Sequence, residues 1–99
     1  MNGIKIRGTG RCVPEHIVTN AKIVETNDEW ITTRTGIQHR HHCTTESHTF
    51  LCVNAAKSAL EKAGVTPDEI GACIVATVTG DNIVPSAACM LQKELGLPE

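Results

Sequence analysis

The segment 28–36 reads DEWITTRTG and contains the only tryptophan of the chain, Trp30, four residues before Arg34. Residues four positions apart lie on one face of a helix, so an indole and a guanidinium group can flank a flat ligand such as adenine. Thr26, just upstream, stands where this helix should begin. These three residues are candidate binding residues, and the structural alternative is a packed tryptophan with capping by Arg34 and Thr26.

Cysteine offers a second kind of chemistry. The chain contains five cysteines, which are scattered and include no C-x-x-C pair: Cys12, Cys43, Cys52, Cys73 and Cys89. This spacing argues against a disulfide framework and against a zinc ribbon. We expect most of these cysteines to be small buried side chains.

A cluster of histidines offers a third kind of chemistry, metal binding. Residues 39–43 read HRHHC, with His48 nearby, and imidazoles and thiolates are good ligands for zinc or copper. No second cluster follows at zinc-finger spacing. A solvated polar loop is therefore the preferred interpretation, a metal site is the weaker alternative, and no permanently bound cofactor is expected.

Composition excludes several classes of function. A chain of 99 residues with 40% hydrophobic but only 2% aromatic residues makes at most one small domain with an aliphatic core. The net charge is −2 and there is no run of Lys or Arg, so we expect no nucleic-acid partner. No apolar run approaches the roughly 18 residues of a membrane span, and the first residues enter a strand pattern rather than a signal peptide. We therefore expect a cytoplasmic chain without a membrane partner.

Hydrophobic periodicity predicts elements in the order β, α, α, β, α. The predicted strands cover residues 4–12 and 72–78, and the predicted helices cover residues 26–36, 47–63 and 85–96. The first helix should open with a capping box, in which Thr26 and Glu29 each accept from the other residue's backbone N–H. A second capping box, in the segment TPDE at residues 66–69, predicts a single helical turn.

The second predicted strand, ACIVATV, is apolar on both faces, which is typical of a buried strand in a parallel sheet. Two strands cannot make such a sheet, because covering both faces needs neighbouring strands and helices that this chain does not supply. The predicted fold is therefore α/β and incomplete as a stand-alone domain.

Four segments, in sequence order, carry a resemblance to a known family. They read GTGRCVPEHIVTN, DEWITTRTGI, LEKAGVTPDEI with the following IVAT, and PSAACMLQKELG. Together they resemble the start of β-ketoacyl-acyl-carrier-protein synthase III, and the likeness covers essentially the whole chain. The resemblance implies a partial thiolase-like fold, in which residues 1–99 form the N-terminal part of the first thiolase-like half and the remainder is absent.

The resemblance also implies an activity. Enzymes of this type are homodimeric acyltransferases of fatty acid biosynthesis. They transfer an acyl group from acyl-coenzyme A, a substrate rather than a cofactor, to a cysteine, and condense it with malonyl-acyl-carrier protein with release of carbon dioxide. In the family, the tryptophan and arginine of DEWI..RTG sandwich the adenine of coenzyme A and the preceding threonine contacts it. By position these residues are Trp30, Arg34 and Thr26.

Two further positions follow from the resemblance. The residue before the later proline lines the end of the partner subunit's acyl pocket, which here is Val84; an ordinary interface or core valine is the alternative. The family's nucleophile lies in an Ala-Ala-Cys-x-Gly-Phe segment, whereas Ala87-Ala-Cys89 is followed by Met90 and Leu91. Cys89 is therefore expected to be a packed thiol.

No catalytic residue is assigned to this chain. The nucleophile motif of the family is expected just beyond residue 99, with its histidine and asparagine partners later, and the carrier protein would act through that missing part. The 99-residue chain is expected to be inactive alone and to hold only the adenine-binding part of the site. An inactive truncated product and a stand-alone module that binds coenzyme A or a nucleotide remain the alternatives.

Overall fold

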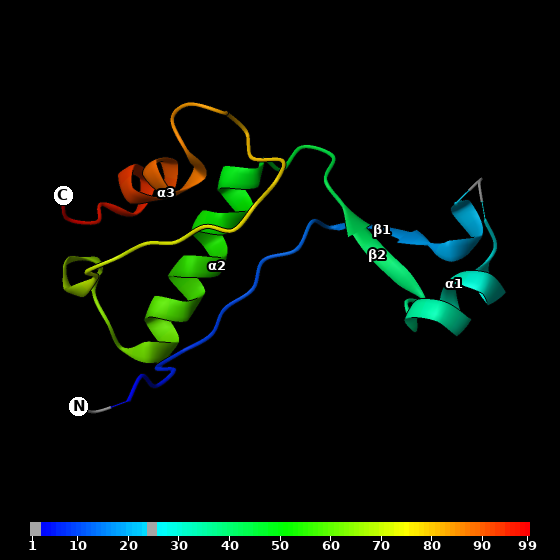
Figure 1. Ribbon diagram of the computed structural model, residues 1–99, viewed down its shortest axis with the longest axis horizontal. Helices are drawn as coiled ribbons and strands as arrows, with labels where there is room; N and C mark the ends of the chain where they lie inside the picture. Colours follow the sequence, from blue (N-terminus) through cyan, green and yellow to red (C-terminus); the bar gives the residue numbers. More distant parts are fainter. Residues whose placement is uncertain (1–2, 24–25) are drawn as a thin grey trace. The chain divides into compact units, whose positions relative to one another are not determined.

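The computed structural model describes residues 3–23 and 26–99 of the chain (Figure 1). In sequence order the elements are β1 (His16–Thr19), the 3-10 helix η1 (Asn20–Lys22), α1 (Asp28–Thr35), β2 (His39–His42), α2 (His48–Ala63), the 3-10 helix η2 (Pro67–Glu69) and α3 (Ala87–Leu95). They divide into two compact units. The larger unit combines Met1–Cys12 with Ser47–Glu99, and the smaller unit is Val13–Glu46.

The smaller unit contains a two-stranded antiparallel ribbon and α1. In the ribbon, His16 of β1 lies opposite His42 of β2, and Thr19 lies opposite His39. The prediction of a polar loop at residues 39–43 is therefore wrong for most of that segment, because residues 39–42 form β2. The prediction failed because a ribbon whose side chains are mostly exposed needs no apolar face, so its sequence carries no alternation to recognise.

The larger unit is arranged around α2. This helix has Ser47 as its N-cap, whose Oγ accepts from the Phe50 N–H at 3.0 Å, and it ends at Gly64 with φ +65°. The predicted helix over residues 47–63 is thus confirmed. Gly8 and Gly10 lie directly against the backbone of α2, where a Cβ on Gly10 would come within 2.5 Å of the Ala59 nitrogen.

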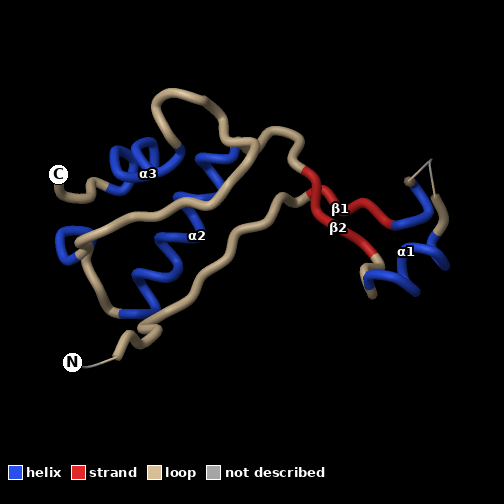
Figure 2. Tube along the Cα trace, viewed as in Figure 1, coloured by secondary structure: helices blue, strands red, loops and turns tan. Residues whose placement is uncertain are grey.

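Neither predicted strand of the larger unit is a strand in this structure. The segments 4–12 and 72–78 have no regular secondary structure, and Figure 2 draws both as loop. Ile4 and Ile74 are 103% and 92% exposed. Alternating apolar residues favour an extended backbone, but a strand forms only when a neighbouring backbone supplies its hydrogen bonds. The described residues supply none to these two segments.

The remaining helical predictions hold with small shifts. The Glu69 carboxylate accepts from the Thr66 N–H at 2.8 Å and from its hydroxyl at 3.0 Å, and η2 follows as the predicted single turn. The last helix begins at Ala87, after the N-cap Ser86, rather than at residue 85. In the part of the chain that the structure describes, no helix has the length and apolar character needed to cross a lipid bilayer.

Candidate functional site

Helix α1 carries the candidate binding residues, and its first turn differs from the prediction. Asn27 is the N-cap, and its Oδ1 accepts from the Trp30 N–H at 2.8 Å. The predicted capping box between Thr26 and Glu29 is wrong. Because the helix starts one residue later than that box requires, Glu29 stands at the second helical position and not at the third, from which a carboxylate reaches back to the cap.

The other end of α1 forms as predicted. The N–H of Gly36 donates to the Thr32 carbonyl at 2.9 Å, and Gly36 has φ +73°, in the left-handed region that glycine tolerates best. The helix therefore has eight residues, and Trp30 and Arg34 are separated by one turn within it.

Trp30 and Arg34 share one face of α1, which confirms the prediction from their spacing. The Arg34 guanidinium carbon lies 4.9 Å from the centroid of the Trp30 ring, a cation–π contact. Trp30 is 51% exposed and Arg34 is also exposed, so the indole is not a core anchor. The pair is accessible to a ligand.

The spacing within this pair has a consequence for a flat ligand. A ring held between two planar groups needs two layers of van der Waals contact, about 7 Å in total. The observed 4.9 Å leaves no such slot. A ligand that is sandwiched here must therefore first displace the flexible Arg34 side chain from the indole.

Thr26 lies half-buried immediately before the cap residue. The capping function that competed with ligand contact in the sequence belongs to Asn27. Thr26 thus precedes α1, and Trp30 lies in its first turn.

Asn20 attaches α1 to the rest of the smaller unit, a role that was not predicted from the sequence. Its side chain is only 1% exposed, and its Nδ2 donates to Asp28 Oδ1 at 2.9 Å, to Thr32 Oγ1 at 3.4 Å and to the Ile37 carbonyl at 2.6 Å. Asparagine is usually a surface residue, so its type predicts a turn after β1 and not burial.

Val84 belongs to the larger unit and is 85% exposed, so it is not a core valine. The same loop contains Asp81, whose Oδ1 accepts from the His48 N–H at 3.0 Å. Its Oδ2 accepts from the Thr49 N–H at 2.8 Å and from the Thr49 hydroxyl at 2.6 Å. The bonds from the Thr49 hydroxyl and backbone hold the pKa of the Asp81 carboxyl below its ordinary value. This carboxylate connects the loop to the first turn of α2.

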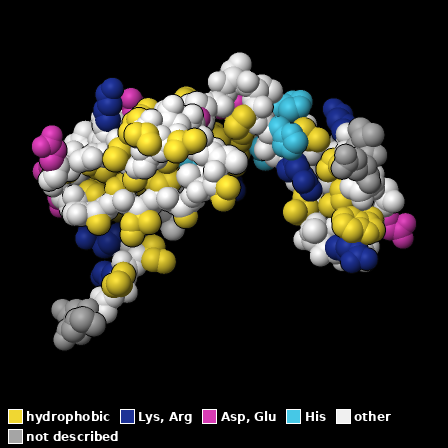
Figure 3. All heavy atoms as spheres, turned by 45° about the horizontal axis from the view of Figure 1, so that its top comes forward, with side chains coloured by type: hydrophobic (Ala, Val, Ile, Leu, Met, Phe, Trp, Pro, Cys, Tyr) yellow, Lys and Arg dark blue, Asp and Glu magenta, His cyan; other side chains and the backbone are white. Residues whose placement is uncertain are grey.

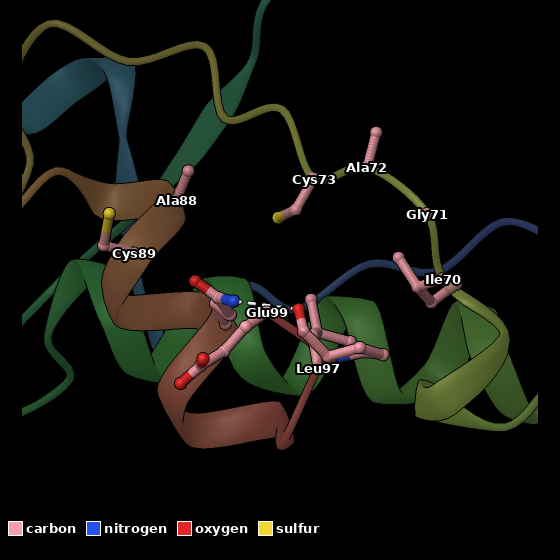
Figure 4. Close-up of a pocket in the computed structure, with 10 residues that line it drawn as sticks. Ile70, Gly71, Ala72, Cys73, Ala88, Cys89, Leu97 and Glu99 are labelled. Atoms are coloured by element: carbon pink, nitrogen blue, oxygen red, sulfur yellow. Dashed lines mark hydrogen bonds between the residues drawn. The ribbon is translucent and has the colours of Figure 1, made fainter.

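None of the five cysteines is fully buried, so the expectation that most are buried was wrong. The buried aliphatic side chains of the described residues are only Ile31, Val53 and Leu91, so the core is too small to enclose the thiols. Cys89 is exposed rather than packed. Figure 4 shows it with Cys73 on a groove between α3 and the segment that follows η2.

One cysteine lies beside a histidine. Cys52 Sγ is 3.7 Å from His48 Nδ1, one helical turn away on α2. Burial raises the pKa of the Cys52 thiol, and the negative charge of Asp81 raises it further. Since the thiolate is the reactive form, both effects work against activation of this thiol.

The histidines of the ribbon have structural contacts. His41 Nδ1 lies 2.7 Å from the Pro14 carbonyl, and the His39 and His41 rings meet edge to face with centroids 6.1 Å apart. Figure 3 shows histidine side chains gathered together at the surface. Across residues 3–23 and 26–99, no three His, Cys, Asp or Glu side chains are arranged to hold a metal ion.

Comparison with known proteins identifies relatives over nearly the whole chain. No protein-family model matches the sequence. The β-ketoacyl-[acyl-carrier-protein] synthase III of Clostridium acetobutylicum is 46% identical over 99 aligned positions, which cover 97% of this chain and 30% of that protein. The Aquifex aeolicus protein of the same name is 46% identical over 96 positions, which cover 94% of this chain and 31% of that protein.

Solved structures agree with these relatives. The crystal structure of 3-oxoacyl-[acyl-carrier-protein] synthase III from Aquifex aeolicus superposes with a TM-score of 0.87 at 45% identity, covering 95% of this chain and 32% of that one. The crystal structure of the priming β-ketosynthase from the R1128 polyketide biosynthetic pathway superposes with a TM-score of 0.83 at 34% identity. The match covers 93% of this chain and 29% of that one. The predicted class, a partial thiolase-like α/β fold, is confirmed. The chain spans less than a third of the length of these relatives.

Proposed function

From its homology to the N-terminal part of the β-ketoacyl-acyl-carrier-protein synthase III enzymes, we propose that this chain forms the adenine-binding part of a coenzyme A site in such an acyltransferase. One observation carries the proposal: the Arg34 guanidinium lies over the Trp30 ring on an exposed face of α1, a helix that is capped at both ends. Such a face offers an aromatic platform and a mobile cation, which together suit a purine that carries phosphates.

Stacking energies favour an exchange of partners on Trp30. An exposed cation–π contact is worth about 0.5–1 kcal/mol, whereas a base stacked on an aromatic side chain is worth about 1–3 kcal/mol. Adenine can therefore displace the Arg34 guanidinium from the indole. Arg34 then covers the opposite face of the adenine, and the hydroxyl of Thr26 bonds to the edge of the base.

In the whole enzyme this contact would act at a distance from the reaction. Binding energy at the adenine end of acyl-coenzyme A orients the thioester carbonyl for attack by a cysteine. The proposed reaction is transfer of the acyl group to that cysteine, then condensation with malonyl-acyl-carrier protein, as a cytoplasmic homodimer in fatty acid biosynthesis. Val84, exposed in its loop, is the proposed contribution to the acyl pocket of the partner subunit.

The 99-residue chain is proposed to bind without catalysing the reaction. Its Ala87-Ala-Cys89 segment continues with Met90 and Leu91, not with the Gly and Phe of the nucleophile motif. Cys52, the cysteine beside a histidine, has a raised thiol pKa. Purified chain should therefore give no ketoacyl product from acyl-coenzyme A and malonyl-acyl-carrier protein, and measured product would overturn this part.

Binding is tested by titrating the chain with coenzyme A and with adenosine 3′,5′-bisphosphate while following Trp30 fluorescence. Both should change the emission to saturation, and pantetheine, which lacks adenine, should not. Calorimetry with Trp30→Ala should show at least a tenfold loss of affinity, about 1.4 kcal/mol. Phe50→Ala is the matched control, because Phe50 is also 51% exposed but lies on α2. Unchanged emission at millimolar coenzyme A would reject binding by this chain.

A further inference from the structure

Asn20 has the most enclosed side chain in the described part of the molecule, with 1% of its surface exposed. Its Nδ2 donates to Asp28, Thr32 and Ile37, and its backbone N–H donates to the Gln38 carbonyl at 3.3 Å. These acceptors lie at the start of α1, in its middle and just after its end. One side chain thus contacts the helix along its whole length.

Helix α1 has little else to hold it. Ile31 is its only buried residue among those described, at 4% exposed, and the other positions are polar or exposed. A single apolar contact leaves a short helix free to tilt and to rotate about its axis. The hydrogen bonds of Asn20 remove that freedom, because they fix points at both ends of the helix.

The amide of Asn20 has one workable orientation. Turned over, its Oδ1 would face the Asp28 carboxylate and the Ile37 carbonyl, which are both acceptors. In the observed orientation the Oδ1 is buried without a hydrogen-bond partner among the described residues. The fold thus tolerates one unsatisfied acceptor at this position and keeps the two N–H donors in use.

We propose that Asn20 is a positioning residue for the candidate binding site: it sets the orientation of α1 and thereby the direction in which Trp30 and Arg34 face. Asn20 is buried, so it acts through the helix and does not touch the ligand. The effect on ligand affinity rests on the proposed function. The effect on α1 does not.

The Asn20→Asp variant tests this role through its pH dependence. An ionised carboxylate cannot donate, and it would lie against the Asp28 carboxylate, the one titratable group bonded to the amide among residues 3–23 and 26–99; Lys22 of η1 is exposed. At pH 7.5 the variant should bind adenosine 3′,5′-bisphosphate about tenfold more weakly than the original chain. Burial and the neighbouring Asp28 carboxylate should raise the pKa of the introduced carboxyl above its ordinary value. At pH 5 it should therefore take up a proton and donate once, so the ratio of affinities should recover toward one.

Two control variants show whether the pH dependence comes from the donor at position 20. Asn20→Ala cannot regain a donor, so its affinity ratio should stay the same at both pH values. Asn54→Asp makes the same chemical change on α2, where Asn54 Nδ2 donates to the Phe50 carbonyl at 2.8 Å, and should leave ligand affinity unchanged. A pH-independent ratio for Asn20→Asp, or wild-type affinity in both Asn20 variants, would overturn the proposal.

Hydrogen exchange measured by NMR gives a readout that needs no ligand. In both Asn20 variants at pH 7.5, protection should fall across Asp28–Thr35 and persist across His48–Ala63. Equal loss of protection in both helices would mean that Asn20 only stabilises the chain as a whole, and would also overturn the proposal. If the original chain fails to bind the nucleotide, the proposed function fails, while exchange still tests Asn20.

Discussion

Asn27 and Thr26 are adjacent residues with separate tasks. Asn27 caps α1 through its side chain, which leaves Thr26 as the candidate for ligand contact. Asparagine and threonine are both favourable N-cap residues, and shifting the cap by one position changes which residue is available for binding. Because Asn27 is the cap, the hydroxyl of Thr26 is the one that is available for a ligand.

This division of tasks gives a prediction for two neighbouring alanine variants. Asn27→Ala should destabilise α1 by about 1 kcal/mol, because the Trp30 N–H loses its acceptor. Thr26→Ala should leave the helix intact and weaken nucleotide binding. Exchange protection of Asp28–Thr35 and Trp30 fluorescence titration measure the two effects. Equal loss of protection in the two variants would contradict this prediction, because it would mean that Thr26 also caps the helix.

At the scale of elements, the contact of Gly8 and Gly10 with α2 organises the larger unit. A Cβ on Gly8 would lie 2.7 Å from the Ala59 carbonyl oxygen and 2.9 Å from the Ala63 Cβ. Both atoms belong to α2, whose backbone is held by its own hydrogen bonds and cannot shift easily. Only residues without a side chain can bring the segment before β1 this close to the helix axis.

Gly10→Ala should therefore lower the stability of the larger unit by about 1–3 kcal/mol, through overpacking against the Ala55 carbonyl and the Ala59 nitrogen. Gly71→Ala is the control, because a Cβ there would meet nothing within 4 Å. It should be neutral or stabilising by up to about 1 kcal/mol. The midpoint of thermal unfolding should be lower for Gly10→Ala than for Gly71→Ala. Equal midpoints would contradict the prediction, because they would mean that α2 can shift to make room for the added methyl group.

Asp81 attaches the loop that contains Val84 to the first turn of α2, and this attachment should depend on pH. Because its carboxyl pKa is lowered in the folded chain, its contribution is complete above the ordinary pKa of aspartate. That contribution is lost as the pH falls through the lowered value, below about pH 4. Protection of the His48 and Thr49 amides should fall over this range.

Asp81→Asn should lower that protection already at pH 7 and flatten its pH dependence. Thr49→Val removes only the hydroxyl donor, which contacts Asp81 at 2.6 Å, and should give an intermediate profile. Identical pH profiles for the original chain and Asp81→Asn would show that the carboxylate does not hold the loop.

At the scale of the whole molecule, the larger unit leaves several large aliphatic side chains exposed. Six of its aliphatic side chains are at least 83% exposed: Ile4, Ile6, Ile74, Val78, Ile83 and Val84. Segments 4–12 and 72–78 also have backbone groups without strand partners among the described residues. Both features favour association with other chains.

We expect the 99-residue chain to self-associate. Sedimentation velocity should show a weight-average mass that rises with concentration, and the double variant Ile74→Thr, Val78→Thr should shift it toward the monomer. Replacing two exposed lysines, Lys57→Thr and Lys62→Thr, is a control that leaves the apolar surface intact. A monomer that unfolds cooperatively would contradict this expectation.

Local chemistry explains which predictions succeeded. Helix α2 was predictable because its cap, its apolar spacing and its terminal glycine lie within one continuous segment. The shared face of Trp30 and Arg34 follows from helical geometry alone. Segment 4–12 was predicted as a strand from its alternating pattern and segment 72–78 from its continuous apolar run, yet neither is a strand, because strand formation depends on partners elsewhere in space.

The sequence by itself determined where the helices lie, that Trp30 and Arg34 share a face, and that the chain resembles one family of condensing enzymes. Only the tertiary structure decided that Asn27 is the cap, that Asn20 is buried against α1, and that Arg34 occupies the face of the indole where a ligand would stack. Asn27 and Arg34 act locally, but adjacent residues can both cap a helix and an exposed arginine can take several positions, so only the structure selects between them. For Asn20 the physical reason is distance along the chain. Caps and periodicity act within a few residues, whereas Asn20 reaches acceptors up to 17 positions away, which no local pattern records.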